Sequence, residues 1–235
     1  MDQRKNIGFE FKRIADANPD KPAIIAEDLV ISYGKLMSIT EAFSLRMQER
    51  GVNQSSTIAV KTTDMIVSLA TMLASSLLGA RYVAFQSDIA DHGVIHPTHF
   101  FRSPDASDEP GYDFVLIDQN WAPAYVSSAE KEKVTYHGYA APDQPWWILR
   151  TSGTTGTPKY LHISQTRVFD RSLAVRNDFV PHKTVFCSLF KCSARPFFVR
   201  ATAALHLKRE QNTVLWGTKS FLTAKDRSKT LVWLI

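Results

Sequence analysis

Apolar and polar residues alternate along the first part of the chain in a pattern that predicts short strands and longer helices. Two apolar runs, 22–27 (PAIIAE) and 29–33 (LVISY), flank Asp28 and predict a small hairpin. Segment 34–50 then places apolar residues at broadly helical spacing, and Gly51 follows as a helix stop. The chain therefore begins with elements of both kinds.

The next segment predicts a buried helix between two strands. Asp64 is a suitable N-cap and Gly79 a suitable C-terminal stop for this mostly apolar helix. Four Ser and Thr residues interrupt the helix, and it falls short of the roughly 20 apolar residues that cross a bilayer, so we expect no membrane span. Strands are predicted on either side, at 57–60 (TIAV) and 82–85 (YVAF), and this β-α-β order indicates a parallel sheet.

The pattern is weaker beyond residue 85. We expect the polar segment 86–112, with its run SPDASDEPG, to be a loop. Further elements are expected at 114–117 and 146–149 (strands), 164–178 (a helix), and 184–190, 199–207, 213–216 and 231–235 (strands and helices). The last segment, LVWLI, fits a buried parallel strand, which needs neighbours on both sides, so we interpret it as part of an interrupted domain. The whole pattern predicts an α/β fold with mostly parallel sheets flanked by helices.

Charge is distributed unevenly over the chain. Residues 1–150 hold 14 Lys and Arg against 19 Asp and Glu, whereas residues 151–235 hold 14 against 4. A basic half of this kind suits nucleic acid, an anionic ligand or an acidic partner. The basic residues are scattered among apolar ones and no nucleic-acid module accompanies them, so we do not expect nucleic-acid binding.

Cysteine usage and the N-terminus indicate the compartment. Cys187 and Cys192 are too few for a disulfide framework, and their spacing is a poor zinc signal. Cys187 alternates with apolar residues and is expected to be buried packing. The opening MDQRKNIGFEFKRI has no sustained apolar run and is not a signal peptide. We expect a cytoplasmic location.

Two other polar segments contain residue types that can form sites. His92, His96 and His99 have a spacing that could suit zinc, but Pro97 breaks a helical arrangement and no carboxylate or Cys lies close by, so no metal site is expected. The acidic loop around Asp105, which includes Asp108 and Glu109, is expected to be solvated.

The stretch TSGTTGTPK (151–159) follows the apolar run WWIL and is the main candidate site. Its glycines allow positive φ and a close approach of the backbone to a ligand, and successive N–H groups in such a turn bind anions. The hydroxyl groups add donors, and the lysine adds a charge suited to a polyphosphate. The candidate ATP-phosphate-binding residues are Thr151, Ser152, Gly153, Thr154, Thr155, Gly156, Thr157 and Lys159.

This loop differs from two better-known phosphate loops. A Walker A loop places Lys directly after its second Gly, whereas Thr157 and Pro158 separate Gly156 from Lys159 here; a G-x-G-x-x-G motif is also absent. A flexible linker is the alternative, although a linker rarely follows a buried strand directly. We expect a loop placed between a strand and a helix that binds phosphate.

TSGTTGTPK resembles the signature loop of the adenylate-forming superfamily, which includes acyl-CoA synthetases, aryl-acid ligases, luciferases and the adenylation domains of peptide synthetases. Eight of its nine residues match fixed positions of the pattern [YF]-T-S-G-[ST]-T-G-x-P-K-G. Segments 11–36 and 77–85 (LLGARYVAF) resemble the family motifs PDKPAI…TY.EL and L-x-A-G-x-x-Y-V-P. The resemblance implies that residues 1–235 are the N-terminal part of an AMP-binding domain, with a candidate subdomain break near 140–150 and no C-terminal domain.

The resemblance also implies a two-step reaction. A carboxylate attacks the α-phosphate of ATP to give an acyl-adenylate and pyrophosphate, and the thiol of CoA or of a carrier's phosphopantetheine then accepts the acyl group. Residues 151–159 would hold the β- and γ-phosphates and follow them as pyrophosphate forms. Mg²⁺ would be required, and its protein ligand would lie downstream of Ile235.

The chain departs from the family pattern in several places. Arg150 stands where Tyr or Phe is common, Tyr160 stands where Gly is usual, and segment 189–194 (LFKCSA) lacks the expected His of the carboxylate pocket. The 235 residues also lack the family's adenine, ribose and hinge motifs and its catalytic Lys. We therefore expect the 235-residue chain alone not to catalyse the reaction.

Other interpretations follow from these departures. One is a non-catalytic nucleotide- or partner-binding module derived from the family, and another is a basic binder of nucleic acid or membrane surfaces. An unfinished sheet edge could also promote a homo-oligomer. The sequence does not define which carboxylic acid is activated.

Overall fold

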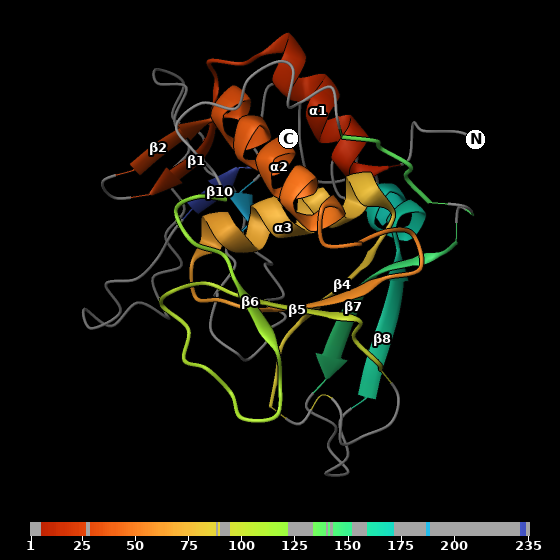
Figure 1. The fold of residues 1–235 in the computed structure, drawn as a ribbon. Coiled ribbons are helices and arrows are strands. Elements are labelled where there is room, and N and C mark those ends of the chain that lie inside the picture. Colours follow the sequence, from red (N-terminus) through yellow and green to blue (C-terminus); the bar gives the residue numbers. More distant parts are fainter. Residues whose placement is uncertain are drawn as a thin grey trace, which may run out of the picture.

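The computed structural model of the chain describes residues 6–26, 29–87, 89, 95–121, 134–139, 141, 143–151, 159–171, 187–188 and 231–233. Elements expected at 199–207 and 213–216 lie outside these residues. The described part forms two sheets together with helices α1 (Ile7–Ala17), α2 (Tyr33–Gln48) and α3 (Met65–Leu78) (Figure 1).

The larger sheet has six strands in the order β6-β5-β3-β4-β7-β8. Every adjacent pair except β7–β8 is parallel. Because β4 lies on one side of β3 and β5 on the other, the direction of winding reverses at β3, as in doubly wound α/β folds. The expected α/β fold with a mostly parallel sheet is confirmed. The strands are β3 (Thr57–Lys61), β4 (Arg81–Ala84), β5 (His99–Arg102), β6 (Phe114–Leu116), β7 (Pro145–Thr151) and β8 (Lys159–Ser164).

Strand β5 contradicts the expectation that 86–112 is a loop. Its four residues, HFFR, pair in parallel with β3 on one side and β6 on the other. Such a short strand, set in a segment rich in Pro and Asp, has too few residues to show an alternating pattern. Its neighbours in the sheet, which come from other parts of the chain, stabilise it.

Helix boundaries follow the predicted caps. The side chain of Asp64 accepts hydrogen bonds from the backbone N–H groups of Ile66 (2.7 Å) and Val67 (3.1 Å), and Gly79 ends α3 with φ of 77°. Gly51, with φ of 84°, follows α2 as expected. Helix α3 packs against α1 and α2 and against β3 and β4, so the helices lie together on one face of the sheet (Figure 1). None of the described helices has the length and apolar character that a membrane crossing requires.

Both faces of the large sheet are packed. Ile58 and Val60 of β3 join the cluster that contains residues of α2 and α3, whereas Ala59 between them belongs to a cluster on the other side. The second cluster also contains Phe85 and Ile148. This two-sided burial explains why the parallel strands are continuous apolar runs rather than alternating ones.

The smaller sheet has the order β2-β1-β10-β9, with β1 (Pro22–Ala26), β2 (Leu29–Ser32), β9 (Cys187–Ser188) and β10 (Leu231–Trp233). The antiparallel pairing of β1 with β2 confirms the expected hairpin. Strand β10 pairs antiparallel with both β1 and β9, so the expectation of a parallel strand is wrong for this segment. An apolar run does not encode strand direction, because the partners of a strand are set by the rest of the fold.

A buried polar junction joins α1 to α3 and to the segment after β8. Asn6 caps α1 by accepting a hydrogen bond from Phe9 N (3.0 Å), and its Nδ2 donates to the carbonyl oxygen of Ser76 (3.0 Å). The side-chain oxygen of Gln165 accepts hydrogen bonds from Ile7 N (2.5 Å) and from Ser76 Oγ (2.9 Å). Residues from three distant segments thus hydrogen-bond to one another inside the protein.

Candidate functional site

The two ends of the candidate phosphate loop, Thr151 and Lys159, lie at the carboxyl edge of the large sheet. Strand β7, which leads into the loop, is parallel to β4 and, through it, to β3. Thr151, the last residue of β7, therefore lies on the same side of the sheet as the carboxyl ends of β3, β4 and β5 (Figure 1). Ligands of open α/β sheets bind outside this carboxyl edge, so the position of the loop suits a binding site.

The two ends of the loop are paired across a hairpin. Thr151 at the end of β7 is the register partner of Lys159 at the start of β8, and the Lys159 side chain is exposed. The loop thus connects two antiparallel strands, and the expectation of a strand followed by a helix is wrong at this point. A helix does follow, at 165–171, but only after β8. The predicted phosphate-binding residues Ser152, Gly153, Thr154, Thr155, Gly156 and Thr157 lie outside the described residues, and their role stays a prediction.

The two departures flanking the motif lie opposite each other. Arg150 and Tyr160 are register partners, one position before the Thr151–Lys159 pair. The Arg150 Nη1 group donates a hydrogen bond to Gln86 Oε1, just beyond β4. The Tyr160 ring packs against the cluster that contains Phe85. The sequence shows both departures but not their pairing, because the seven residues between Thr151 and Lys159 hide the register.

Two polar networks occupy the carboxyl ends of β3 and β5. Lys61 Nζ lies 2.9 Å from Glu109 Oε2 and 3.1 Å from Ser107 Oγ, and 5.7 Å from the centre of the Phe85 ring. Asp105 accepts hydrogen bonds from the backbone and the hydroxyl of Thr63 and from the hydroxyl of Ser103. Asp105 is exposed, as expected of a solvated loop, but Asp105 and Glu109 also have hydrogen-bond partners within the protein.

Opposing effects act on the carboxyl group of Asp105. Partial burial by itself would raise the pKa of Asp105, but the hydrogen bonds from Ser103 and Thr63 outweigh it and lower the pKa from the ordinary 3.8. The ionised carboxylate is therefore the form that these donors stabilise.

The segment that contains His92, His96 and His99 was not expected to bind metal, and its described residues form no metal site. His92 lies outside them. His99 is in β5, where its Nδ1 lies 2.8 Å from Thr98 Oγ1 and its Nε2 lies 3.0 Å from the carbonyl oxygen of Arg50. Across the described ranges, His, Cys, Asp and Glu form no group of three that could hold a metal ion.

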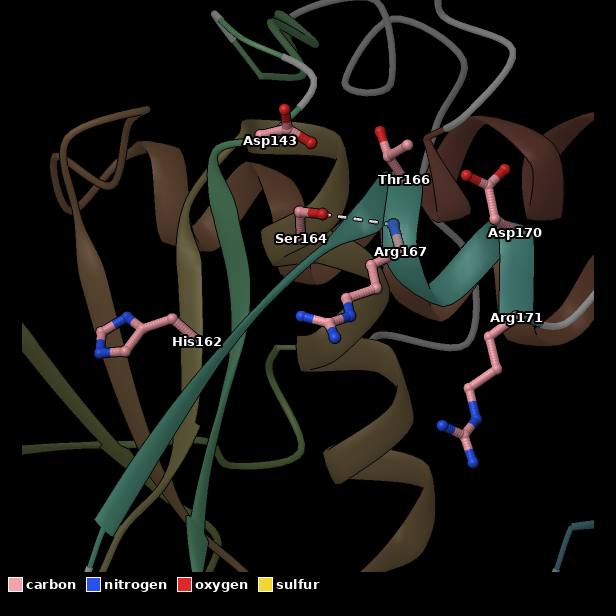
Figure 2. Close-up of a pocket in the computed structure, with 7 residues that line it drawn as sticks. All are labelled: Asp143, His162, Ser164, Thr166, Arg167, Asp170 and Arg171. Carbon is pink, nitrogen blue, oxygen red and sulfur yellow. Dashed lines mark hydrogen bonds between the residues drawn. The ribbon is translucent and has the colours of Figure 1, made fainter.

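A concave region lies at the other end of β8, where the sequence predicted no site. A shallow pocket of about 600 Å³ is formed there by β8, by Asp143, two residues before β7, and by the helix at 165–171, and Arg167 extends its guanidinium group across it (Figure 2). In the sequence, only the four-residue spacing of Arg167 and Arg171 indicates that two cations lie on one face of a helix here. The lining residues are Asp143, His162, Ser164, Thr166, Arg167, Asp170 and Arg171.

Comparison with known proteins defines the class to which this fold and loop belong. Residues 11–193 match the family described as AMP-binding enzyme, which is more than half of the chain. The chain belongs to this family of adenylate-forming enzymes, as the resemblance predicted.

Several relatives share part of their length with the chain. It is similar to the Delta-poly-L-ornithine synthetase of Acinetobacter baumannii, with 27% identity over 169 residues that span 71% of the chain and 13% of that protein. It is also similar to the D-alanine–D-alanyl carrier protein ligase of Bacillus licheniformis, with 24% identity over 176 residues, 72% of the chain and 34% of that protein. The chain thus spans a minor part of the length of these relatives.

Solved structures show the same fold. The O-succinylbenzoate Coenzyme A synthetase of Bacillus subtilis, solved in complex with AMP, superposes with a TM-score of 0.58 at 17% identity, over 74% of this chain and 46% of that one. The nonribosomal peptide synthetase FmoA3 superposes with a TM-score of 0.60 at 18% identity, over 76% of this chain and 20% of that one. At such identities the likeness concerns the fold.

Proposed function

We propose that this chain supplies the ATP-phosphate-binding part of an enzyme that activates a carboxylic acid as an acyl-adenylate. The observation that best supports the proposal is the position of the two ends of TSGTTGTPK: Thr151 ends β7 and exposed Lys159 begins β8, at the carboxyl edge of the sheet. A ligand at this edge meets the loop directly. Membership of the AMP-binding family supports ATP as the nucleotide.

The proposed reaction assigns a defined task to the loop. A carboxylate oxygen bonds to the α-phosphorus of ATP, the bond between that phosphorus and the bridging oxygen breaks, and the electron pair leaves with pyrophosphate. Charge therefore grows on the leaving group, and donors already aimed at it lower the barrier. Thr151 to Lys159 supply such donors: backbone N–H groups, hydroxyls and one ammonium group. The pairing of Thr151 with Lys159 keeps the two ends of this donor set together.

The carboxylates of Asp105 and Glu109 at this edge are candidates for binding Mg²⁺. Asp105 and Glu109 are engaged by Thr63, Ser103 and Lys61, and no cluster of three ligating side chains occurs within the described ranges. We therefore assign the expected Mg²⁺ to the nucleotide phosphates rather than to a cage of these residues. When bound, the ion neutralises phosphate charge.

The acyl acceptor is proposed to be a thiol of one of two kinds. The names of relatives support both, since one acts with a carrier protein and another with Coenzyme A. We propose further that the 235 residues alone do not complete adenylation and that the protein acts in the cytoplasm. We also propose that an edge strand such as β8 can pair with the same strand of a second copy. Light scattering of the purified chain tests the last point.

Nucleotide binding tests the central proposal. Titration of Mg·ATP into the chain should show binding, and Lys159→Ala should weaken it about tenfold through loss of a charge-assisted contact. Lys35→Ala is a matched control, because it removes another exposed lysine, on α2. Equal affinities of wild type and Lys159→Ala would remove Lys159 from the phosphate site.

Pyrophosphate exchange separates the proposed enzyme from its alternative. We expect no exchange by the 235-residue chain with a panel of carboxylic acids, and exchange once the chain is part of a protein that carries the remaining family motifs. ATP binding without exchange in that longer protein would favour a non-catalytic nucleotide-binding module. Exchange by the short chain alone would contradict the proposal that it is incomplete as a catalyst.

A further inference from the structure

The loop-bearing end of the β7–β8 hairpin extends beyond the rest of the sheet. The ladder between β4 and β7 ends at the pair Val83–Ile148, whereas the ladder between β7 and β8 continues to Thr151–Lys159. The last three residues of β7 therefore have a backbone neighbour on one side only within the described sheet. A hairpin end of this kind is held in place by side-chain contacts rather than by the ladder.

One such contact comes from β7. Arg150 Nη1 donates a hydrogen bond to the side-chain oxygen of Gln86, and Gln86 lies two residues beyond the end of β4. The carbonyl of Gln86 accepts a hydrogen bond from Ile89 N at 2.9 Å, which fixes the turn that follows β4. The Arg150–Gln86 bond thus ties the hairpin to the segment after β4, two residues past the last ladder pair on β7 and three residues past it on β4.

A second contact comes from β8. The Tyr160 ring, directly across from Arg150, packs against the cluster that contains Val83, Phe85 and Ile148. Arg150 and Tyr160 therefore point to the same face of the sheet, and each holds its own strand against the end of β4. The next residues outward are Thr151 and Lys159, where the candidate phosphate loop begins and ends.

We propose that Arg150 and Tyr160 form a cross-strand clamp, closed onto Gln86, that positions Thr151 and Lys159 for a nucleotide polyphosphate. The choice of ligand rests on the proposed function, whereas the clamp itself consists only of contacts within the protein. Arg150 and Tyr160 are positioning residues: they set where the phosphate-binding donors stand and need not touch the phosphates. The clamp should matter for ATP, whose β- and γ-phosphates need the loop, and much less for AMP.

Hydrogen exchange of the full chain tests the clamp without any ligand. Arg150→Ala and Gln86→Ala should each reduce the protection of amides in 149–151 and 159–161 by about tenfold, as expected when one part-buried charge-assisted hydrogen bond is lost. Arg150→Lys should restore part of it, because the ammonium group can still reach an amide oxygen. Arg81→Ala is the matched control: this arginine lies at the amino end of β4, bonded to the Ser55 carbonyl oxygen, and should leave these amides unchanged.

Nucleotide affinity then separates positioning from general destabilisation. In Arg150→Ala, Gln86→Ala and Tyr160→Ala, the ATP affinity should fall several-fold more than the AMP affinity, whereas a loss of folding would lower both alike. Full ATP affinity in Gln86→Ala beside a loss in Arg150→Ala would overturn the clamp in favour of direct phosphate contact by Arg150. Unchanged hydrogen exchange of the amides in 149–151 and 159–161 in both Arg150→Ala and Gln86→Ala would overturn the clamp as well. Failure of wild type to bind ATP would refute the proposed function, and the exchange data would still decide the clamp.

Discussion

The two edges of the large sheet are built from different kinds of contact. At the amino edge, buried groups meet at close range: Trp146 Nε1 donates to Ser75 Oγ at 3.1 Å, and the buried Tyr139 hydroxyl donates to the carbonyl oxygen of Ala80 at 2.8 Å. At the carboxyl edge, more open polar groups meet, such as Lys61 with Glu109. Substitutions at the amino edge should therefore change stability, and those at the carboxyl edge should change ligand binding.

The largest expected effect is at Gly79, on the amino edge. Its φ of 77° disfavours any side chain, and a Cβ there would lie 1.7 Å from the carbonyl oxygen of Gly138. Gly79→Ala should lower the free energy of unfolding by about 3 kcal/mol or more, because the backbone of one segment must move. Urea denaturation followed by circular dichroism measures the loss.

Gly111→Ala is the matched control for that substitution. Gly111 also has positive φ, 87°, but a Cβ there would meet nothing within 4 Å. It should cost about 1 kcal/mol, the price of the backbone conformation alone. Equal losses in the two variants would show that the contact between Gly79 and Gly138 does not hold the amino edge together.

The second prediction concerns the buried carboxamide of Gln165. Gln165→Met keeps the length of the side chain but removes the acceptor of Ile7 N and Ser76 Oγ, and should cost about 2 kcal/mol. Arg167→Met, on the same helix but exposed, should change stability by less than about 0.5 kcal/mol. At temperatures where both remain folded, neither should alter ATP affinity. A clear loss of affinity in folded Gln165→Met would break the division between the edges.

Local signals made much of the fold predictable. The caps at Asp64 and Gly79 acted through neighbouring backbone groups, so a short segment contained all the information needed for α3. Strand β5 was missed because its stability comes from β3 and β6, which lie in other segments. The same reasoning explains β10, whose antiparallel direction depends on β1 and β9.

The candidate site was predictable in composition but not in geometry. The residue types of 151–159 predict phosphate binding, and the parallel strands place the two ends of this segment, Thr151 and Lys159, at the carboxyl edge. The partnership of Arg150 with Tyr160 depends on a hairpin register, and that of Arg150 with Gln86 spans 64 positions of sequence. Gln165 and Ile7 are separated by 158 positions. Contacts at such separations leave no local pattern to detect.

The smallest expected effect is a pH-dependent one at the carboxyl edge. Because the pKa of Asp105 is lowered from the ordinary 3.8 in the folded state, its carboxylate stabilises the protein above that pH. The contribution should disappear as the pH falls through the lowered value. The difference in unfolding free energy between wild type and Asp105→Asn should therefore shrink between pH 7 and pH 3, while remaining below about 1 kcal/mol because the group is exposed.

Removing one donor should identify the cause of that shift. Ser103→Ala deletes a hydroxyl that bonds to Asp105, so the carboxyl group should titrate at a higher pH, which carbon-detected nuclear magnetic resonance can follow. Ser107→Ala deletes a nearby hydroxyl that bonds to Lys61 instead, and should leave the titration of Asp105 in place. Equal shifts in both variants would mean that the charge balance of the whole edge, rather than the hydrogen bond from Ser103, sets the pKa of Asp105. The carboxyl edge would then respond to charge as one unit, unlike the amino edge, where single contacts carry the stability.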